Sequence, residues 1–187
     1  MGRRRKRGGR KVNREPMQAL AHKPTVHMWT DGSCYPNPGP GGWAVVLRYL
    51  ETEEVIQISG GCEYPATNNT AEMQAVIEGL MALGSSTSVN LYSDSLYVIN
   101  GIGAWCKGNP IPNHHGYVVR WRNNGWRRSD GRPVPNRPLW ESLRELAASQ
   151  VLFVPYWVRG HSGNEWNEWC DKAAAEERKK CELKLTG

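Results

Sequence analysis

The most informative stretch of the chain runs Thr30-Asp31-Gly32-Ser33-Cys34-Tyr35-Pro36-Asn37-Pro38-Gly39-Pro40-Gly41-Gly42-Trp43-Ala44. It joins two strand-like apolar runs, Val26–Thr30 and Trp43–Tyr49, through a turn rich in Gly and Pro. This pattern places a lone carboxylate, Asp31, at the end of a buried strand. An ionised carboxylate there is unfavourable unless it is paired, hydrogen-bonded or bound to a cation. Asp31 is therefore a candidate metal ligand, and the ordinary alternative is a residue that only helps to form the turn.

The 187 residues are enough for one domain with a full hydrophobic core, and their net charge of +6 is unevenly distributed. Residues 1–15 hold eight Lys/Arg and one acid, and residues 105–140 hold seven Lys/Arg and one acid, whereas the rest of the chain has a net charge of −7. Acids that bind metal, combined with basic segments that bind phosphate, suit a nucleic-acid enzyme. The alternative is that both basic segments are only solvated surface.

Other classes of protein fit the composition poorly. The five cysteines include no Cys-x-x-Cys pair, which argues against a zinc site or a disulfide framework. No apolar run is long enough to span a membrane, and no signal peptide is recognisable. We therefore expect a cytoplasmic protein without membrane contact, and a monomer by default.

The chain pattern predicts an α/β fold of order βββαβα…αβα, a mixed sheet with helices on its faces. Residues 1–23 have too few apolar residues to fold and predict a flexible basic tail before a single domain at 24–187. The stretch from Trp105 to Pro138 is irregular and basic. The predicted elements are strands at Val26–Thr30, Trp43–Tyr49 and Val55–Ser59, a helix from Asn69 or Thr70 to Gly84, a strand at Val89–Ser93, helices over Leu96–Trp105 and Trp140–Ser149, a strand at Val151–Val158 and a helix from Asn164 through Lys180.

Three further acids belong with Asp31. Asp94 also follows a strand, and Glu72 lies in the first turn of the next helix. Asp171 lies in the last helix, ten residues after His161. Four carboxylates from two strand ends and two helices could converge on one patch.

Each of these acids also has an ordinary structural explanation. Glu72 lies three residues after Asn69 and fits the acidic position of a capping box. Asp94 fits the N-cap of the helix that follows it. Asp171 fits a solvated position that faces basic residues of its own helix.

Taken together, these residues resemble type 1 ribonuclease H, in its bacterial form with a basic protrusion. The resemblance covers roughly residues 25–175 and is carried by Thr30-Asp31-Gly32-Ser33-Cys34 with Asn37-Pro38-Gly39-Pro40-Gly41-Gly42-Trp43, Thr67-Asn68-Asn69 with Ala71-Glu72, Tyr92-Ser93-Asp94-Ser95 with Tyr97-Val98, Gly125-Trp126 with Pro133-Val134 and Leu139-Trp140, and Gly160-His161 with Cys170-Asp171. It implies a five-stranded mixed sheet, three antiparallel strands then parallel strands, flanked by helices. It also implies an endoribonuclease that cleaves the RNA strand of RNA–DNA hybrids.

By this resemblance the catalytic residues are Asp31, Glu72, Asp94, Asp171 and His161. The four carboxylates would hold two Mg²⁺ ions, with Mn²⁺ as a substitute, because carboxylate oxygens suit hard divalent cations. Asp31 would bridge both ions. Glu72 and Asp94 would hold the ion on the leaving-group side, and Asp171 the ion on the nucleophile side. His161 would assist by transferring protons or by helping product to leave, and the products would carry 5′-phosphate and 3′-hydroxyl ends.

The resemblance also indicates how the hybrid is bound. The turn after Asp31 and the start of the Glu72 helix would contact the 2′-hydroxyl groups of the RNA strand. Thr67 and Asn68 resemble a pocket for a DNA-strand phosphate, although the same segment also fits a helix cap. Leu96 stands where many relatives carry Gln, so one polar contact differs. The expected substrate-binding residues are Cys34, Asn37, Thr67, Asn68, Asn69, Ser95, Trp105, Trp121, Arg122, Trp126, Arg127, Arg128 and Asn167.

Residues 105–140 resemble the basic protrusion of the family, which grips the DNA strand with Trp and Lys/Arg, and they contain an insertion at about 107–119. Trp105 also fits the core. Trp121 or Trp126, amid Arg and Asn, is expected to face the nucleic-acid backbone. The basic tail lies outside the resemblance and is expected to add sequence-independent affinity for nucleic acid.

Two other function classes fit part of the pattern. A transposase, resolvase or exonuclease of related fold shares acids on a similar sheet, but lacks the run from Asp31 to Trp43 and the protrusion. A non-catalytic module that only binds hybrids has no need of four acids and His161.

Overall fold

The computed structural model describes residues 24–186, so the tail predicted at 1–23 lies outside the described residues. In chain order the elements are β1 (Thr25–Cys34), β2 (Gly41–Tyr49), β3 (Val55–Gly61), α2 (Asn68–Leu83), β4 (Ser88–Ser93), α3 (Leu96–Ile102), β5 (Gly103–Cys106), β6 (Asn109–His115), α4 (Tyr117–Asn123), α5 (Arg137–Ala148), β7 (Leu152–Trp157) and α6 (Glu165–Thr186). The order agrees with the predicted pattern at both ends, and the middle adds a hairpin and a short helix. Within 24–186, no helix has the length and apolar character needed to cross a membrane.

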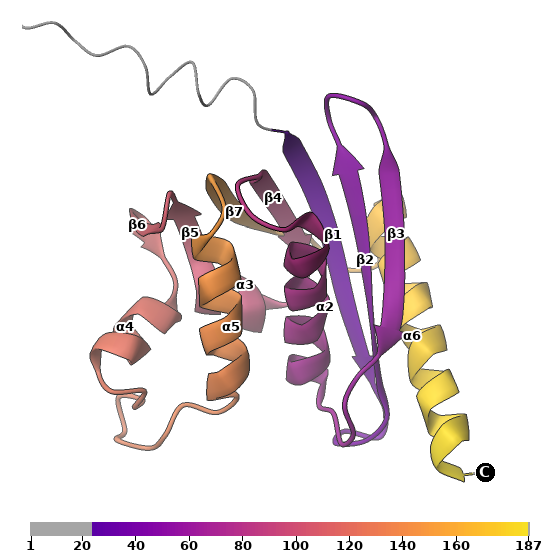
Figure 1. The fold of residues 1–187 in the computed structure, drawn as a ribbon. Helices are drawn as coiled ribbons and strands as arrows, with labels where there is room; N and C mark the ends of the chain where they lie inside the picture. Colours follow the sequence, from indigo (N-terminus) through magenta and orange to yellow (C-terminus); the bar gives the residue numbers. More distant parts are fainter. Residues whose placement is uncertain (1–23, 187) are drawn as a thin grey trace, which may run out of the picture.

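The strands form one mixed sheet in the order β3-β2-β1-β4-β7-β5-β6 (Figure 1). The first three strands form the predicted antiparallel meander, and β4 pairs in parallel with both β1 and β7. Over the described residues the sheet has seven strands rather than the expected five. The two additional strands come from residues 103–115, which form a hairpin whose first strand pairs antiparallel with β7. The segment expected to be an irregular insertion therefore extends the sheet.

The predicted helix over Leu96–Trp105 is wrong in its last three residues. The helix α3 ends at Ile102, and Gly103 leaves it with a φ of 65°, a conformation that glycine adopts readily. The chain then enters β5, which buries Trp105. The helix predicted at Trp140 begins earlier, at Arg137, with a proline in its first turn.

Helices cover both faces of the sheet. Successive side chains of a strand point to opposite faces, and β2 shows this alternation clearly. Val45 and Leu47 join the larger core beneath α2, α3 and α5, whereas Ala44 and Val46 pack against α6. Figure 1 shows α6 on the opposite side of the sheet from α2. The helix α6 packs on β1, β2 and β3, at one side of the sheet.

Candidate active site

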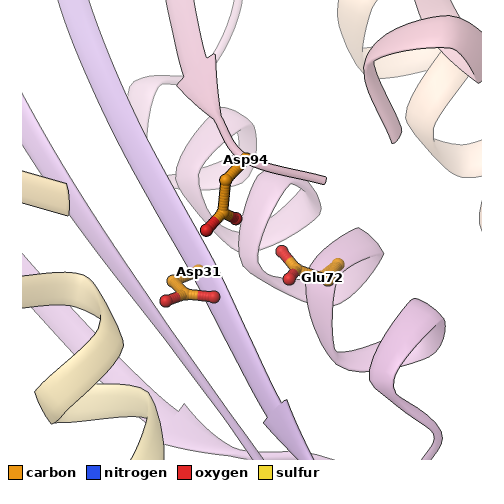
Figure 2. A group of neighbouring side chains, drawn as sticks. All are labelled: Asp31, Glu72 and Asp94. Atoms are coloured by element: carbon orange, nitrogen blue, oxygen red, sulfur yellow. The ribbon is translucent and has the colours of Figure 1, made fainter. Parts of the chain in front are cut away.

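Three carboxylates from different elements converge beside β1 (Figure 2). Asp31 belongs to β1, Glu72 to α2, and Asp94 follows β4. Each residue places a carboxylate oxygen within 4.8 Å of the oxygens of the other two. We call these three residues the acidic cluster.

The register of the sheet explains where Asp31 lies. Asp31 is not at the end of a strand, as predicted, but inside β1, where it pairs with Ala44 of β2. A role limited to forming a turn is thereby excluded. On its other side β1 pairs with β4 only as far as Trp29 and Tyr92. Because β4 ends first, Asp94 follows it into the space beside the projecting part of β1.

The position of Glu72 depends on a glycine in β1. A Cβ at Gly32 would lie 2.2 Å from the backbone nitrogen of Glu72 and 2.3 Å from the carbonyl carbon of Ala71. Because glycine has no Cβ, the first turns of α2 lie directly against β1. This contact between backbones brings Glu72 to the strand that carries Asp31.

The explanations of Glu72 and Asp94 as helix caps are wrong. Thr67 is the N-cap of α2 and forms a capping box with Thr70. Ser95 is the N-cap of α3, and its hydroxyl accepts a hydrogen bond from the helix backbone. The helix ends are satisfied without either carboxylate.

The environment of the acidic cluster penalises its negative charge. Burial raises the pKa of Asp31 to about 7, and the neighbouring Asp94 carboxylate adds to the rise. Burial, followed by the charges of Asp31 and Asp94, holds the pKa of Glu72 well above its usual range. Burial also raises the pKa of Asp94. In addition, Glu72 Oε2 is buried and has no hydrogen-bond partner among residues 24–186. Hard divalent cations bind to carboxylate oxygens, and their positive charge would offset the repulsion between these three acids.

Asp171 and His161 lie at the margin of the acidic cluster. The charge of Asp171 on α6 contributes to the raised pKa values of Asp31 and Asp94, although its oxygens are outside the group defined by the 4.8 Å limit. His161 Nδ1 lies 3.8 Å from Asp171 Oδ2, and the His161 side chain is 79% exposed. Three of the four predicted acids are thus tightly grouped, with Asp171 beside them and His161 on the outer side.

Two neighbours of Asp94 were missing from the sequence-based prediction. Trp157 Nε1 donates a hydrogen bond of 3.1 Å to the backbone carbonyl oxygen of Asp94. A Cβ at Gly160 would lie 2.4 Å from Asp94 Oδ2, so a larger residue at position 160 would displace the Asp94 carboxylate. The Gly160-His161 pair is a usable signal for this contact. Nothing in the local sequence marks Trp157, because its contact depends on how β4 and β7 pair.

Comparison with known proteins agrees with this geometry. The sequence profile of the RNase H family matches residues 23–179. The ribonuclease H of Thermoanaerobacter sp. (strain X514) is 44% identical over 156 residues, which cover 83% of this chain and 90% of that protein. The ribonuclease H of Rhodopirellula baltica is 45% identical over 158 residues, which cover 82% of this chain and 90% of that protein.

The chain belongs to the RNase H family. Its relatives are named ribonuclease H, and the chain is accordingly a nuclease.

Solved RNase H structures share the fold. LC9-RNase H1, a type 1 RNase H with the type 2 active-site motif, superposes with a TM-score of 0.69 at 24% identity, covering 85% of this chain and 74% of that chain. LC11-RNase H1 in complex with an RNA/DNA hybrid superposes with a TM-score of 0.57 at 18% identity, covering 83% of this chain and 97% of that chain.

In this RNase H chain, one group of expected substrate contacts lies together. Cys34 and Asn37 lie at the end of β1 and in the turn after it, and Thr67–Asn69 begin α2. The two segments are tied by a β-bridge between Gly39 and Ala66, with backbone hydrogen bonds of 2.9 and 2.8 Å. The Cys34 thiol also donates to the Ala66 carbonyl oxygen at 3.2 Å. Cys34, Asn37 and Thr67–Asn69 thus lie on two joined segments next to the acidic cluster. We call these five residues the turn edge.

Several other expected contacts are buried instead. Trp105 and Trp126 are 4% and 8% exposed, and Asn167 is 2% exposed. Trp121 packs edge-on against Trp140, with 5.4 Å between ring centroids. Burial therefore gives no support to substrate contacts by Trp105, Trp126 and Asn167. The indoles fill the core between α4, α5 and the sheet.

Three arginines among the expected substrate contacts lie on the surface of residues 105–140. Arg122, Arg127 and Arg128 are all exposed. Ser95 and Leu96 begin α3 immediately after the last residue of the acidic cluster, and Leu96 is 56% exposed. An apolar side chain therefore stands at the surface beside the cluster.

Proposed function

We propose that this protein is an endoribonuclease that hydrolyses the RNA strand of RNA–DNA hybrids with divalent cations held at the acidic cluster. The observation that carries the proposal is the group of three carboxylates with oxygens within 4.8 Å of one another, including the unpartnered Glu72 Oε2, in a chain of the RNase H family. The complex of LC11-RNase H1 with an RNA/DNA hybrid supports the same class of substrate here.

Four carboxylates are available for two Mg²⁺ ions, or for Mn²⁺ in their place. Bound divalent cations would activate the attacking water and stabilise the leaving oxygen. Asp31 groups with Glu72 and Asp94, and its pKa also responds to Asp171. Asp31 would help to hold both ions. Glu72 and Asp94 would hold the ion that stabilises the leaving oxygen, and Asp171 would hold the ion that activates the water.

His161 has a different role from the acids. Its exposed ring lies 3.8 Å from Asp171, beside the acidic cluster. Imidazole groups are common proton donors and acceptors in catalysis. We assign it proton transfer or assistance to product release, with products that carry 5′-phosphate and 3′-hydroxyl ends.

Two surfaces would bind the two strands. The turn edge lies next to the acidic cluster and offers backbone, amide and hydroxyl groups to the 2′-hydroxyls that distinguish RNA from DNA. The exposed arginines Arg122, Arg127 and Arg128 offer positive charge to the DNA strand. Arginine contacts to phosphate position a strand without reading its sequence.

A direct test uses Mg²⁺ with end-labelled RNA–DNA hybrid, double-stranded RNA, double-stranded DNA and single-stranded RNA. We expect cleavage of the RNA strand of the hybrid alone, with products that accept a 5′ label only after phosphatase treatment. Asp94→Asn serves as the control for contaminating nuclease. Binding of the hybrid without cleavage would identify a non-catalytic module, and cleavage of DNA would identify a related fold with another substrate.

A further inference from the structure

Aromatic side chains form a stack across the face of the sheet that carries α6. Trp29, Tyr92 and Tyr156 are paired in register on β1, β4 and β7, so their side chains share one face. The ring centroids of Trp29 and Tyr92 are 5.0 Å apart with an interplanar angle of 18°, and those of Tyr92 and Tyr156 are 5.4 Å apart at 20°. We call these three residues the aromatic stack.

The aromatic stack is closed at one end and open at the other. Trp29 is 5% exposed and lies 6.0 Å from the Trp166 ring of α6, whereas Tyr156 is 45% exposed. The next strand, β5, pairs with β7 only at Leu152 and Phe153. Within residues 24–186, the edge of β7 beside Tyr156 therefore has no partner strand. Another flat ring could continue the series on the outer face of Tyr156.

The aromatic stack lies beside the acidic cluster. Asp31 follows Trp29 by two residues, and Asp94 follows Tyr92 by two residues. Two residues of extended chain span about 7 Å. Trp157, the residue after Tyr156, donates its indole hydrogen bond to the Asp94 backbone. Tyr156 pairs with Tyr92, two residues before Asp94, so the open end of the stack lies near the acidic cluster.

We propose that the open face of Tyr156 binds an unpaired nucleobase of the RNA strand that passes the acidic cluster. The proposal rests on the proposed function and refines its substrate to hybrids with a single-stranded RNA tail. Every nucleobase presents a π face, so stacking on a tyrosine ring requires no particular sequence. A base inside the hybrid is already stacked on its neighbours, so only an unpaired base is free to bind. The aromatic stack lies next to the acidic cluster, where the RNA strand is proposed to bind. This position favours RNA over a protein partner.

The test compares a blunt hybrid with the same hybrid extended at either end of its RNA strand by an unpaired tail. The fluorescent base 2-aminopurine is placed at successive tail positions, because stacking on an aromatic ring quenches its emission. Binding is measured without divalent cations for the wild-type protein and for Tyr156→Leu and Tyr156→Phe. We expect one tail to strengthen binding about tenfold and one tail position to be quenched. Both effects should persist in Tyr156→Phe and disappear in Tyr156→Leu.

Controls separate this proposal from the proposed function and from misfolding. Tyr64→Leu removes another exposed tyrosine, at 59% exposure, and should leave the difference between tailed and blunt hybrids unchanged. Thermal unfolding checks that Tyr156→Leu folds. Equal affinity for blunt and tailed hybrids, or a tail effect that survives in Tyr156→Leu, would overturn the proposal. Cleavage of the blunt hybrid is measured in parallel, and its absence would refute the proposed function alone.

Discussion

At the residue scale, Asp31 combines the catalytic role proposed for it with an unfavourable charge. Asp31→Asn removes a proposed metal ligand and also relieves repulsion with Glu72 and Asp94. We expect RNA cleavage to fall by more than about 1000-fold. Without divalent cations the variant should be more stable, by about 2–4 °C in Tm for each kcal/mol of repulsion removed. Single-turnover cleavage and scanning calorimetry measure the two effects, and a less stable Asp31→Asn protein would contradict the electrostatic argument.

His161 should behave differently from Asp31 under the same assays. The side chain is exposed and outside the acidic cluster, so His161→Ala should leave Tm unchanged. Cleavage should slow by about 10- to 100-fold, below the loss expected for a metal ligand. The comparison needs saturating Mg²⁺ and one hybrid substrate for both variants. Equal losses for His161→Ala and Asp31→Asn would remove the distinction between assistant and ligand.

The pKa of Asp31 predicts how stability depends on pH when divalent cations are removed. Its ordinary value is 3.8 and its folded value is about 7. Between these values the folded protein holds a proton that the unfolded chain has released, so this group makes the free energy of unfolding fall as pH rises from about 4 to 7. Burial lowers the pKa of His27 and acts in the opposite direction. The difference between wild type and Asp31→Asn therefore measures the contribution of Asp31 together with its effect on the pKa of Glu72.

Urea unfolding in EDTA at pH 5 and pH 8 measures this difference. Asp31→Asn should gain more stability over wild type at pH 8 than at pH 5. Mg²⁺ should stabilise the wild type more at pH 8, because it binds the deprotonated carboxylates. A gain that is independent of pH would show that Asp31 ionises normally in the folded protein.

At the scale of elements, the contact between β1 and α2 sets the geometry of the acidic cluster. Gly32→Ala introduces a Cβ 2.2 Å from the Glu72 nitrogen, so the helix must move away from the strand. We expect a loss of about 1–3 kcal/mol in the free energy of unfolding and a further loss of cleavage as Glu72 separates from Asp31. Ser33→Ala is the neighbouring control. Normal activity in Gly32→Ala would show that Glu72 does not depend on this contact.

Elements with a clear period were predictable from the sequence, and the hairpin was not. The meander, α2 and β4 carry regular apolar patterns that predict strand or helix without tertiary information. Residues 103–115 have no such pattern, and Pro110 and Pro112 argue against a central strand. They form β5 and β6 because an edge of β7 is available for pairing, and an edge is a property of the assembled sheet.

The acidic site was predictable as a set of residues but not in its geometry. The motifs around Asp31, Glu72, Asp94 and Asp171 mark the four acids. The tight grouping of three of them depends on where β4 stops pairing with β1 and on a close contact between backbones. The burial of Trp126 was missed for a similar reason, because charged sequence neighbours do not determine which way an indole points.

At the scale of the whole molecule, opposite charges are separated along the chain. The acidic cluster lies within the described domain, whereas residues 1–15 carry eight Lys/Arg and one acid. The tail lies outside the described residues, and its contribution follows from charge alone. Cations that neutralise phosphates release condensed counterions, so binding weakens as salt rises. The tail should therefore affect hybrid affinity and its salt dependence without changing the chemistry at the cluster.

Deletion of residues 1–22 should weaken hybrid binding and flatten the dependence of log K on log salt concentration. The slope should fall by about 0.9 for each phosphate contact that the tail makes. The maximal cleavage rate should not change, because every residue assigned to the chemistry lies in the described domain. A tail of equal length with each Lys and Arg replaced by Ser separates charge from chain length and should behave like the deletion. An unchanged salt slope in both variants would show that the tail does not bind the hybrid.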